Sequence, residues 1–223
     1  MAEPKRLAYF YREYETVAAL VDAEFASNLE RFRDHITPDG SPGLQCRRGC
    51  NACCSHLFEI TALESAYISR YLRQLPPAER QRLRERAAAY KVAREKLLDA
   101  RARELKAQHI EGKLPVVGFR LACPALGDDG ACTIYEARPL ICRKFGMPLY
   151  NPRRPGVLGA CELNFKDGDA LDADDIVAHQ TRIHERWESV KAAFQSEHAQ
   201  KADELTVADA LLADSEAAFP EGK

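Results

Sequence analysis

The sequence predicts a mainly α protein, in which several amphipathic helices surround a loop-rich, cysteine-lined centre with at most a small β-hairpin. Three observations support this fold class. Apolar residues recur at helical spacing in charged segments near both ends of the chain. A further long segment is rich in Ala, Glu, Arg and Leu, which favour helix. The middle of the chain instead has short β-prone runs with Pro and Gly between them and no helical period.

A first amphipathic helix is expected over residues 11–36, because apolar residues recur there at spacings of three and four. These residues are Tyr14, Val17, Val21, Phe25, Leu29 and Phe32. The run Thr37–Gly43 contains two prolines and two glycines and should end the helix in a loop. A second helix is expected from Thr61 to about Leu75, since Thr61 and Glu64 have the spacing of a capping box.

A long, highly charged helix is expected next, as an insertion over residues 77–111 that begins after Pro76-Pro77. Its apolar stripe is thin and consists of Leu83, Ala87, Tyr90, Leu97 and Ala100. Such a stripe predicts packing along one seam, against a protein partner or a second copy of the chain. The alternative is a solvated surface helix.

The segment that follows is loop-rich. Gly127–Gly130 predicts the tight turn of a small hairpin, which would bring Cys123 and Cys132 near one another. A turn of helix is expected around Tyr135–Cys142. Two C-terminal helices are expected within residues 172–219. The first should start at the capping residues Asp172 and Asp175 and run to about His198, and the second should run from Thr206 to about Phe219.

The chain of 223 residues is expected to form a single domain, residues 1–223, with its cysteine-cluster core at 44–165. Lys+Arg 32 against Asp+Glu 34 gives a formal charge of −2, which argues against nucleic acid and anionic membranes as partners. No apolar stretch approaches the roughly 20 residues that span a bilayer, and no signal-peptide core follows Met1. A cytoplasmic location is therefore expected.

The spacing of the eight cysteines is the main functional signal. Cys46-x3-Cys50-x2-Cys53-Cys54 places four thiols within nine residues, so that a short turn can direct several sulfurs at one point. Disulfides are rare in a reducing compartment, and adjacent cysteines could bridge only through a strained ring. A buried, unliganded thiol is the other alternative, above all for Cys161. The candidate metal ligands are Cys46, Cys50, Cys53, Cys54, Cys123, Cys132, Cys142 and Cys161.

Thiolate ligands favour zinc, iron in a cluster such as 4Fe-4S, or copper(I), since magnesium and calcium prefer oxygen. Eight thiolates fit two four-cysteine zinc sites, or one iron-sulfur cluster with spare thiols. Cys53 and Cys54 point their side chains in different directions and could serve different centres. Arg138 and Arg143 are the best candidates to neutralise an anionic site, by contact with a thiolate, an internal carboxylate or a bound cofactor. His56 is not expected to be a ligand.

The cysteine motifs resemble those of the YkgJ-like cysteine-cluster proteins, a family of zinc- or iron-chelating domains. The matching motifs are Cys46-x3-Cys50-x2-Cys53-Cys54, Cys123-Pro124-x-Leu126, Gly130-x-Cys132-x-Ile134-Tyr135, Arg138-Pro139-x-x-Cys142-Arg143 and Phe145-Gly146. The resemblance covers roughly Cys46 to Cys161 and implies metal chelation by the cysteines at these positions.

Two hypotheses follow for the function. The first is a metal-binding protein that chelates zinc or iron and presents its helices to a partner. The alternative is an iron-sulfur redox or methyl-transfer enzyme, because a related branch resembles the flagellin lysine N-methylases. No acid-base pair accompanies the cysteines, and the chain shows no glycine-rich fingerprint for a nucleotide-like cofactor. Whether the protein is an enzyme is left open.

Overall fold

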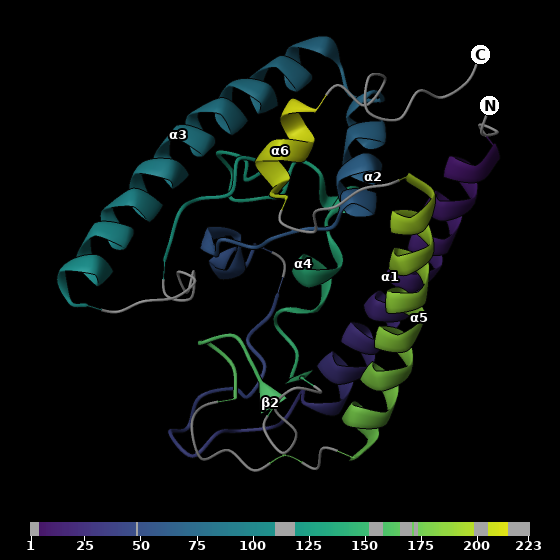
Figure 1. Cartoon of the computed structure of the whole chain (residues 1–223). Coiled ribbons are helices and arrows are strands. Elements are labelled where there is room, and N and C mark those ends of the chain that lie inside the picture. The colour runs from purple at the N-terminus through teal and green to yellow at the C-terminus, as the bar shows by residue number, and fades with distance from the viewer. Residues whose placement is uncertain are drawn as a thin grey trace. The chain divides into compact units, whose positions relative to one another are not determined.

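The computed structural model describes residues 5–47, 49–109, 119–151, 158–165, 171, 174–198 and 205–213. These residues form six α-helices, two short 3-10 helices and a single two-stranded sheet (Figure 1). The predicted fold class, mainly α with at most a small hairpin, is therefore confirmed. Among the described residues, no helix has both the length and the apolar character needed to cross a membrane.

The chain divides into two compact units, which are interleaved along the sequence. Unit 1 consists of Met1–Cys53, Arg138–Lys201 and Glu221–Lys223. Unit 2 consists of Cys54–Ala137 and Ala202–Pro220. The cysteine core expected at 44–165 thus contributes to both units, and the single domain over 1–223 stays a prediction.

Unit 1 is built on two long helices, α1 (Lys5–Arg31) and α5 (Asp174–His198), which lie side by side in Figure 1. Their apolar faces meet, for example where the rings of Phe10 and Phe194 pack edge to face with centroids 5.2 Å apart. The short helix α4 (Leu140–Lys144) also packs against α1. The amphipathic pattern predicted for both long helices is therefore confirmed.

The bounds of α1 differ from the expected 11–36 at both ends. The helix starts at Lys5 because its buried face continues towards the N-terminus through Leu7 and Phe10. It ends at Arg31, earlier than expected, because the residues that follow already turn into the loop. Ile36 is exposed and forms an isolated bridge with Pro42, which closes that loop.

The only sheet among the described residues lies in unit 1, where β1 (Leu149–Tyr150) pairs antiparallel with β2 (Leu158–Gly159). Gln180 ties this sheet to α5: its Oε1 accepts from the backbone N–H of Tyr150 at 2.8 Å, and its Nε2 donates to the Pro148 carbonyl at 2.6 Å. The hairpin expected around Gly127–Gly130 is reduced to a tight turn with one bridge, Leu126 to Cys132.

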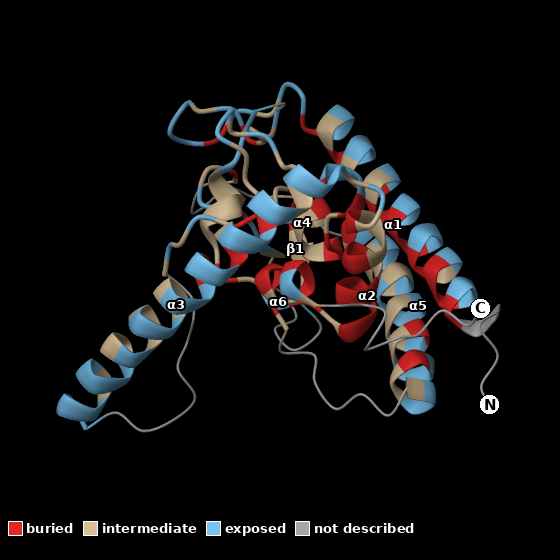
Figure 2. Cartoon of the chain, turned by 90° about the horizontal axis from the view of Figure 1, so that it is seen from above, coloured by how far each residue is buried: buried red, intermediate tan, exposed pale blue. Residues whose placement is uncertain are grey.

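Unit 2 packs three helices around one apolar core: α2 (Ala62–Leu72), α3 (Pro77–Ala107) and α6 (Val207–Leu212). The capping box predicted before α2 is present, since Glu64 N–H donates to Thr61 Oγ1 at 3.2 Å and Thr61 N–H donates to Glu64 Oε2 at 2.8 Å. In Figure 2, α2 and α6 are mostly buried, whereas α3 is mainly exposed.

The thin stripe of α3 packs on the core of its own unit through Leu83, Ala87 and Tyr90. Contact of this helix with a partner or a second copy stays a prediction. The turn of helix expected around Tyr135–Cys142 is divided into a 3-10 turn, Tyr135–Ala137, and α4. The start expected at Asp172 lies outside the described residues. The helices α3 and α6 end at Ala107 and Leu212, before the expected residue 111 and Phe219, because Gln108 and Ala213 are already their C-caps.

Candidate metal centre

None of the eight cysteines, all of them described, forms a disulfide, and they divide between the two units. Unit 1 contains Cys46, Cys50, Cys53, Cys142 and Cys161. Unit 2 contains Cys54, Cys123 and Cys132. This grouping differs from the order along the sequence, because the distant Cys161 shares a unit with the first three thiols and the boundary falls between Cys53 and Cys54.

The first thiols are presented by two consecutive turns. The backbone N–H of Cys50 donates to the Arg47 carbonyl at 3.0 Å, and this bond closes a turn that contains Gly49. Gly49 has a φ of +87°, a left-handed conformation that glycine adopts without strain. A 3-10 turn, Ala52–Ser55, follows and carries both adjacent cysteines.

Two thiols of unit 1, Cys46 and Cys161, have pKa values that respond to the charges of other thiols. Burial raises the pKa of Cys46, a hydrogen bond from Asn164 opposes this shift, and the charges of Cys50 and Cys53 raise the pKa further. Burial also raises the pKa of Cys161, with smaller contributions that include the charges of Cys46 and Cys53. Such effects decay with distance, so these sulfurs lie in one neighbourhood. We call Cys46, Cys50, Cys53 and Cys161 the four-thiol cluster.

The sulfur of Cys46 lies directly against the backbone of Gly146, where a Cβ atom would overlap it. Asn164, which is 2% exposed, donates from Nδ2 to the Cys46 sulfur at 3.4 Å and to the Gly146 carbonyl at 2.6 Å. An N–H group directed at sulfur is typical of the surroundings of metal-binding thiolates. Sequence reasoning missed Asn164, since a lone asparagine three residues after a cysteine carries no recognisable spacing.

The donor chemistry of the cluster fits zinc or iron, because both metals accept four thiolates. The sulfurs are grouped but not gathered around one point: within the described part of the chain, no three or more Cys, His, Asp or Glu side chains are arranged to hold a metal ion. Metal binding would therefore require the four thiols to approach one another more closely. Cys142, on α4 in the same unit, contributes a fifth thiol.

The thiols of unit 2 lie in a more apolar setting. The backbone N–H of Cys123 donates to the Cys54 carbonyl at 2.7 Å, which joins the segments that carry them. Cys123 and Cys132 are partly buried against the apolar core. Burial raises the pKa of the neighbouring Tyr90 to about 12, against the effect of Arg94 and with a contribution from the charge of Cys123. These surroundings suit a buried thiol as well as a ligand.

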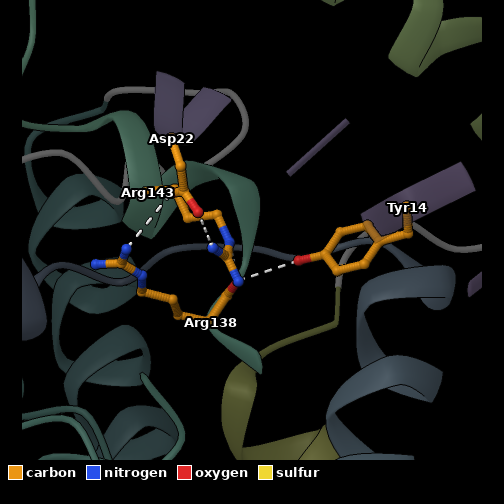
Figure 3. Close-up of polar contacts among 4 residues, drawn as sticks. All are labelled: Tyr14, Asp22, Arg138 and Arg143. Atoms are coloured by element: carbon orange, nitrogen blue, oxygen red, sulfur yellow. Dashed lines mark hydrogen bonds and ion pairs between the residues drawn. The ribbon is translucent and has the colours of Figure 1, made fainter. Parts of the chain in front are cut away.

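Arg138 and Arg143 both contact the carboxylate of Asp22 on α1 (Figure 3). Arg143 Nη1 lies 2.5 Å from Asp22 Oδ2, and Arg138 Nη2 lies 3.5 Å from Asp22 Oδ1. The Arg138 carbonyl accepts from Arg143 Nε at 3.0 Å and from the Tyr14 hydroxyl at 3.1 Å. The contact predicted with an internal carboxylate is thus present for both arginines, while their role in binding a cofactor stays a prediction.

His56 has neighbours other than the four-thiol cluster. It belongs to unit 2, where its ring stacks on Phe58 and its Nδ1 lies 3.0 Å from Arg120 Nη1. The expectation that His56 is not a metal ligand stays a prediction.

A comparison with protein families matches residues 45–156 to the CxxCxxCC family, which is described as "Putative zinc- or iron-chelating domain". The chain belongs to this family. The match covers half of the chain and does not include Cys161 or Asn164. In the family name CxxCxxCC, two residues lie between the first and second cysteines and two between the second and third. In this chain three residues lie between Cys46 and Cys50. No curated protein and no solved structure matches the chain.

Proposed function

We propose that this CxxCxxCC member chelates zinc or iron through the thiolates of the four-thiol cluster. The hydrogen bonds between residues 43–46 and 161–165 carry this assignment, among them Asn164 Nδ2 to the Cys46 sulfur at 3.4 Å, because they bring two distant cysteine segments to one thiol-rich neighbourhood. Family membership supports zinc or iron as the ligand. We also propose a cytoplasmic location, where a reducing environment would keep these cysteines as thiols available to a metal.

Four thiolates suffice for a tetrahedral zinc site or for one 4Fe-4S cluster. Bound at the cluster, zinc would supply a structural cross-link, whereas iron-sulfur would supply an electron-transfer centre. The thiols of unit 2, Cys54, Cys123 and Cys132, are proposed as ligands of a second centre, and a ligand role for Cys142 stays a prediction. In this proposal the positive charges of Arg138 and Arg143 compensate the negative charge of the thiolates in the same unit. The two arginines would also attract an anionic cofactor.

The proposal is tested by metal analysis and an ultraviolet-visible spectrum on protein purified without oxygen. We expect stoichiometric zinc without colour, or iron with acid-labile sulfide and a brown absorbance band. Protein that holds neither metal while all its thiols are reduced would contradict the proposal.

Single substitutions test which thiols form the centre. Cys161→Ser should remove the metal of the four-thiol cluster, although Cys161 lies outside the family match. Cys142→Ser is the matched control, since Cys142 belongs to the same unit but lies outside the cluster. If Cys142→Ser removes this metal and Cys161→Ser retains it, the assignment to the four-thiol cluster is wrong.

A further inference from the structure

We propose that Asn164 is a positioning residue of the four-thiol cluster, which holds the Cys46 sulfur through its side chain and the Cys161 segment through its backbone. This inference rests on the proposed function. It assigns a role to a residue that is not a cysteine and that lies beyond the family match at 45–156.

The partners of the Asn164 amide fix its orientation. Its Oδ1 accepts from the backbone N–H of Gln45 at 2.8 Å, and its Nδ2 donates to the Gly146 carbonyl at 2.6 Å. A backbone N–H can only donate and a carbonyl can only accept, so the amide cannot be flipped. The second hydrogen of Nδ2 is therefore the one directed at the Cys46 sulfur, 3.4 Å away.

The backbone around Asn164 ties the two cysteine segments together. Asn164 N–H donates to the Cys161 carbonyl at 2.9 Å and closes a turn directly after this thiol. The Leu163 carbonyl accepts from the Gln45 side chain at 2.6 Å, and Phe165 N–H donates to the Gly43 carbonyl at 2.9 Å. The segment 161–165 is thus bound to residues 43–46, which lie far away in the sequence.

The direction of the Asn164 N–H group gives it a chemical role beyond packing. A hydrogen bond donated to sulfur favours the thiolate over the thiol, and it disperses negative charge when several thiolates share one metal. Because Asn164 is 2% exposed, water would not readily replace the lost donor. Partners of this kind typically change metal affinity by about 10–100-fold.

The test compares full-length wild-type protein with Asn164→Asp, which keeps the size of the side chain and an oxygen for Gln45 but presents no N–H to sulfur when ionised. Zn²⁺ affinity is measured by competition with a chromophoric chelator, and Co²⁺ is used to record the thiolate-to-cobalt charge-transfer band. For Asn164→Asp we expect Zn²⁺ binding about 10–100-fold weaker than in wild type, and a shifted Co²⁺ charge-transfer band.

Asn28→Ala is the matched control, because Asn28 is another buried asparagine of unit 1 whose amide contacts Glu24 and Met147 instead of a cysteine. Asn28→Ala should leave the Zn²⁺ affinity and the Co²⁺ charge-transfer band unchanged, even if it lowers the stability of the protein. Wild-type affinity and an unshifted band in Asn164→Asp would overturn the inference. Wild-type protein that binds neither ion and also contains no iron when purified without oxygen would overturn the proposed function instead.

A measurement on the wild type covers the case in which Asn164→Asp does not fold. With ¹¹³Cd²⁺ bound, a scalar coupling between the metal and the Asn164 side-chain amide proton reports a hydrogen bond to a metal-bound sulfur. We expect this coupling. Bound cadmium without it would overturn the role of Asn164.

Discussion

The buried guanidinium of Arg143 binds the carboxylate of Asp22 through Nη1 at 2.5 Å, and this ion pair connects α4 with α1. The Arg143 side chain is 8% exposed, whereas Asp22 is half-buried. A buried guanidinium has lost most of its hydration and depends on its carboxylate partner.

Asp22→Ala should therefore destabilise the protein by about 1–3 kcal/mol, because it leaves Arg143 buried without its carboxylate partner. Chemical denaturation measures the change in the free energy of unfolding. Glu13→Ala is the control on the same helix, since Glu13 pairs with the more exposed Arg186 at 3.2 Å and should cost below about 1 kcal/mol. Equal losses in the two variants would show that the burial of Arg143 has no energetic consequence.

Gly146→Ala should disturb the four-thiol cluster, because the new Cβ atom would overlap the Cys46 sulfur. We expect a loss of about 1–3 kcal/mol in stability from this overpacking, together with weaker zinc binding. Gly159→Ala is the control, since its Cβ would meet nothing closer than the Leu149 carbonyl at 3.9 Å. Urea denaturation and zinc titration of both variants give the comparison, and a Gly146→Ala protein that behaves like wild type would contradict the close contact.

The stability of unit 2 should depend on pH through Asp209. Burial would raise the pKa of this carboxyl, but hydrogen bonds from Lys91 and Thr206 outweigh that effect and hold the pKa below its usual value. A lowered folded-state pKa stabilises the fold fully above the unfolded value, about 3.9, and this stabilisation is lost as the pH falls through the lower folded value.

Asp209→Asn should consequently cost about 1 kcal/mol at pH 6, and the difference from wild type should shrink below about pH 4. Asp128→Asn is the control, because Asp128 is 96% exposed in its pair with Arg86 and should have little effect at either pH. Urea denaturation at pH 6 and pH 3 provides the measurement. A difference that grows towards pH 3 would contradict the direction of the Asp209 shift.

Removal of the metal of the four-thiol cluster should destabilise unit 1. If zinc binds at the four-thiol cluster, saturation at about 100 times its dissociation constant adds about 2.7 kcal/mol to the stability of the bound state. Hydrogen exchange with and without a chelator should show protection lost at residues 43–47 and 161–165. Protection that persists at both segments after chelation would place this metal elsewhere.

Local sequence patterns predicted much of the fold. The capping box of Thr61 and Glu64 and the break at Pro76-Pro77 mark helix starts that the structure contains. The two-residue strands β1 and β2 were not predictable, since a period of two needs a longer run to be visible. The true start of α1 depends on Leu7 and Phe10 finding tertiary partners, which no local pattern records.

The candidate site was predictable in its residue types but not in its grouping. Spacing alone marks Cys46, Cys50 and Cys53 as neighbours, whereas only the folded chain brings Cys161 within electrostatic range of Cys46 and Cys53. The contacts of Asn164 with Cys46 and of Asp22 with Arg143 join residues more than 100 positions apart. Such pairs depend on the path of the whole chain and leave no local signature.

The position of α6 has a consequence for biosynthesis. This helix packs against α2 and α3, and its Ala210 carbonyl accepts from the buried Ser69 hydroxyl at 2.9 Å. Nascent α2 and α3 therefore expose their apolar faces until residues 207–212 have been synthesised, and they depend meanwhile on the ribosome surface or on chaperones. A ribosome that stalls shortly before Val207 would release a chain whose second unit lacks part of its core, and we expect such a product to be degraded rather than stored.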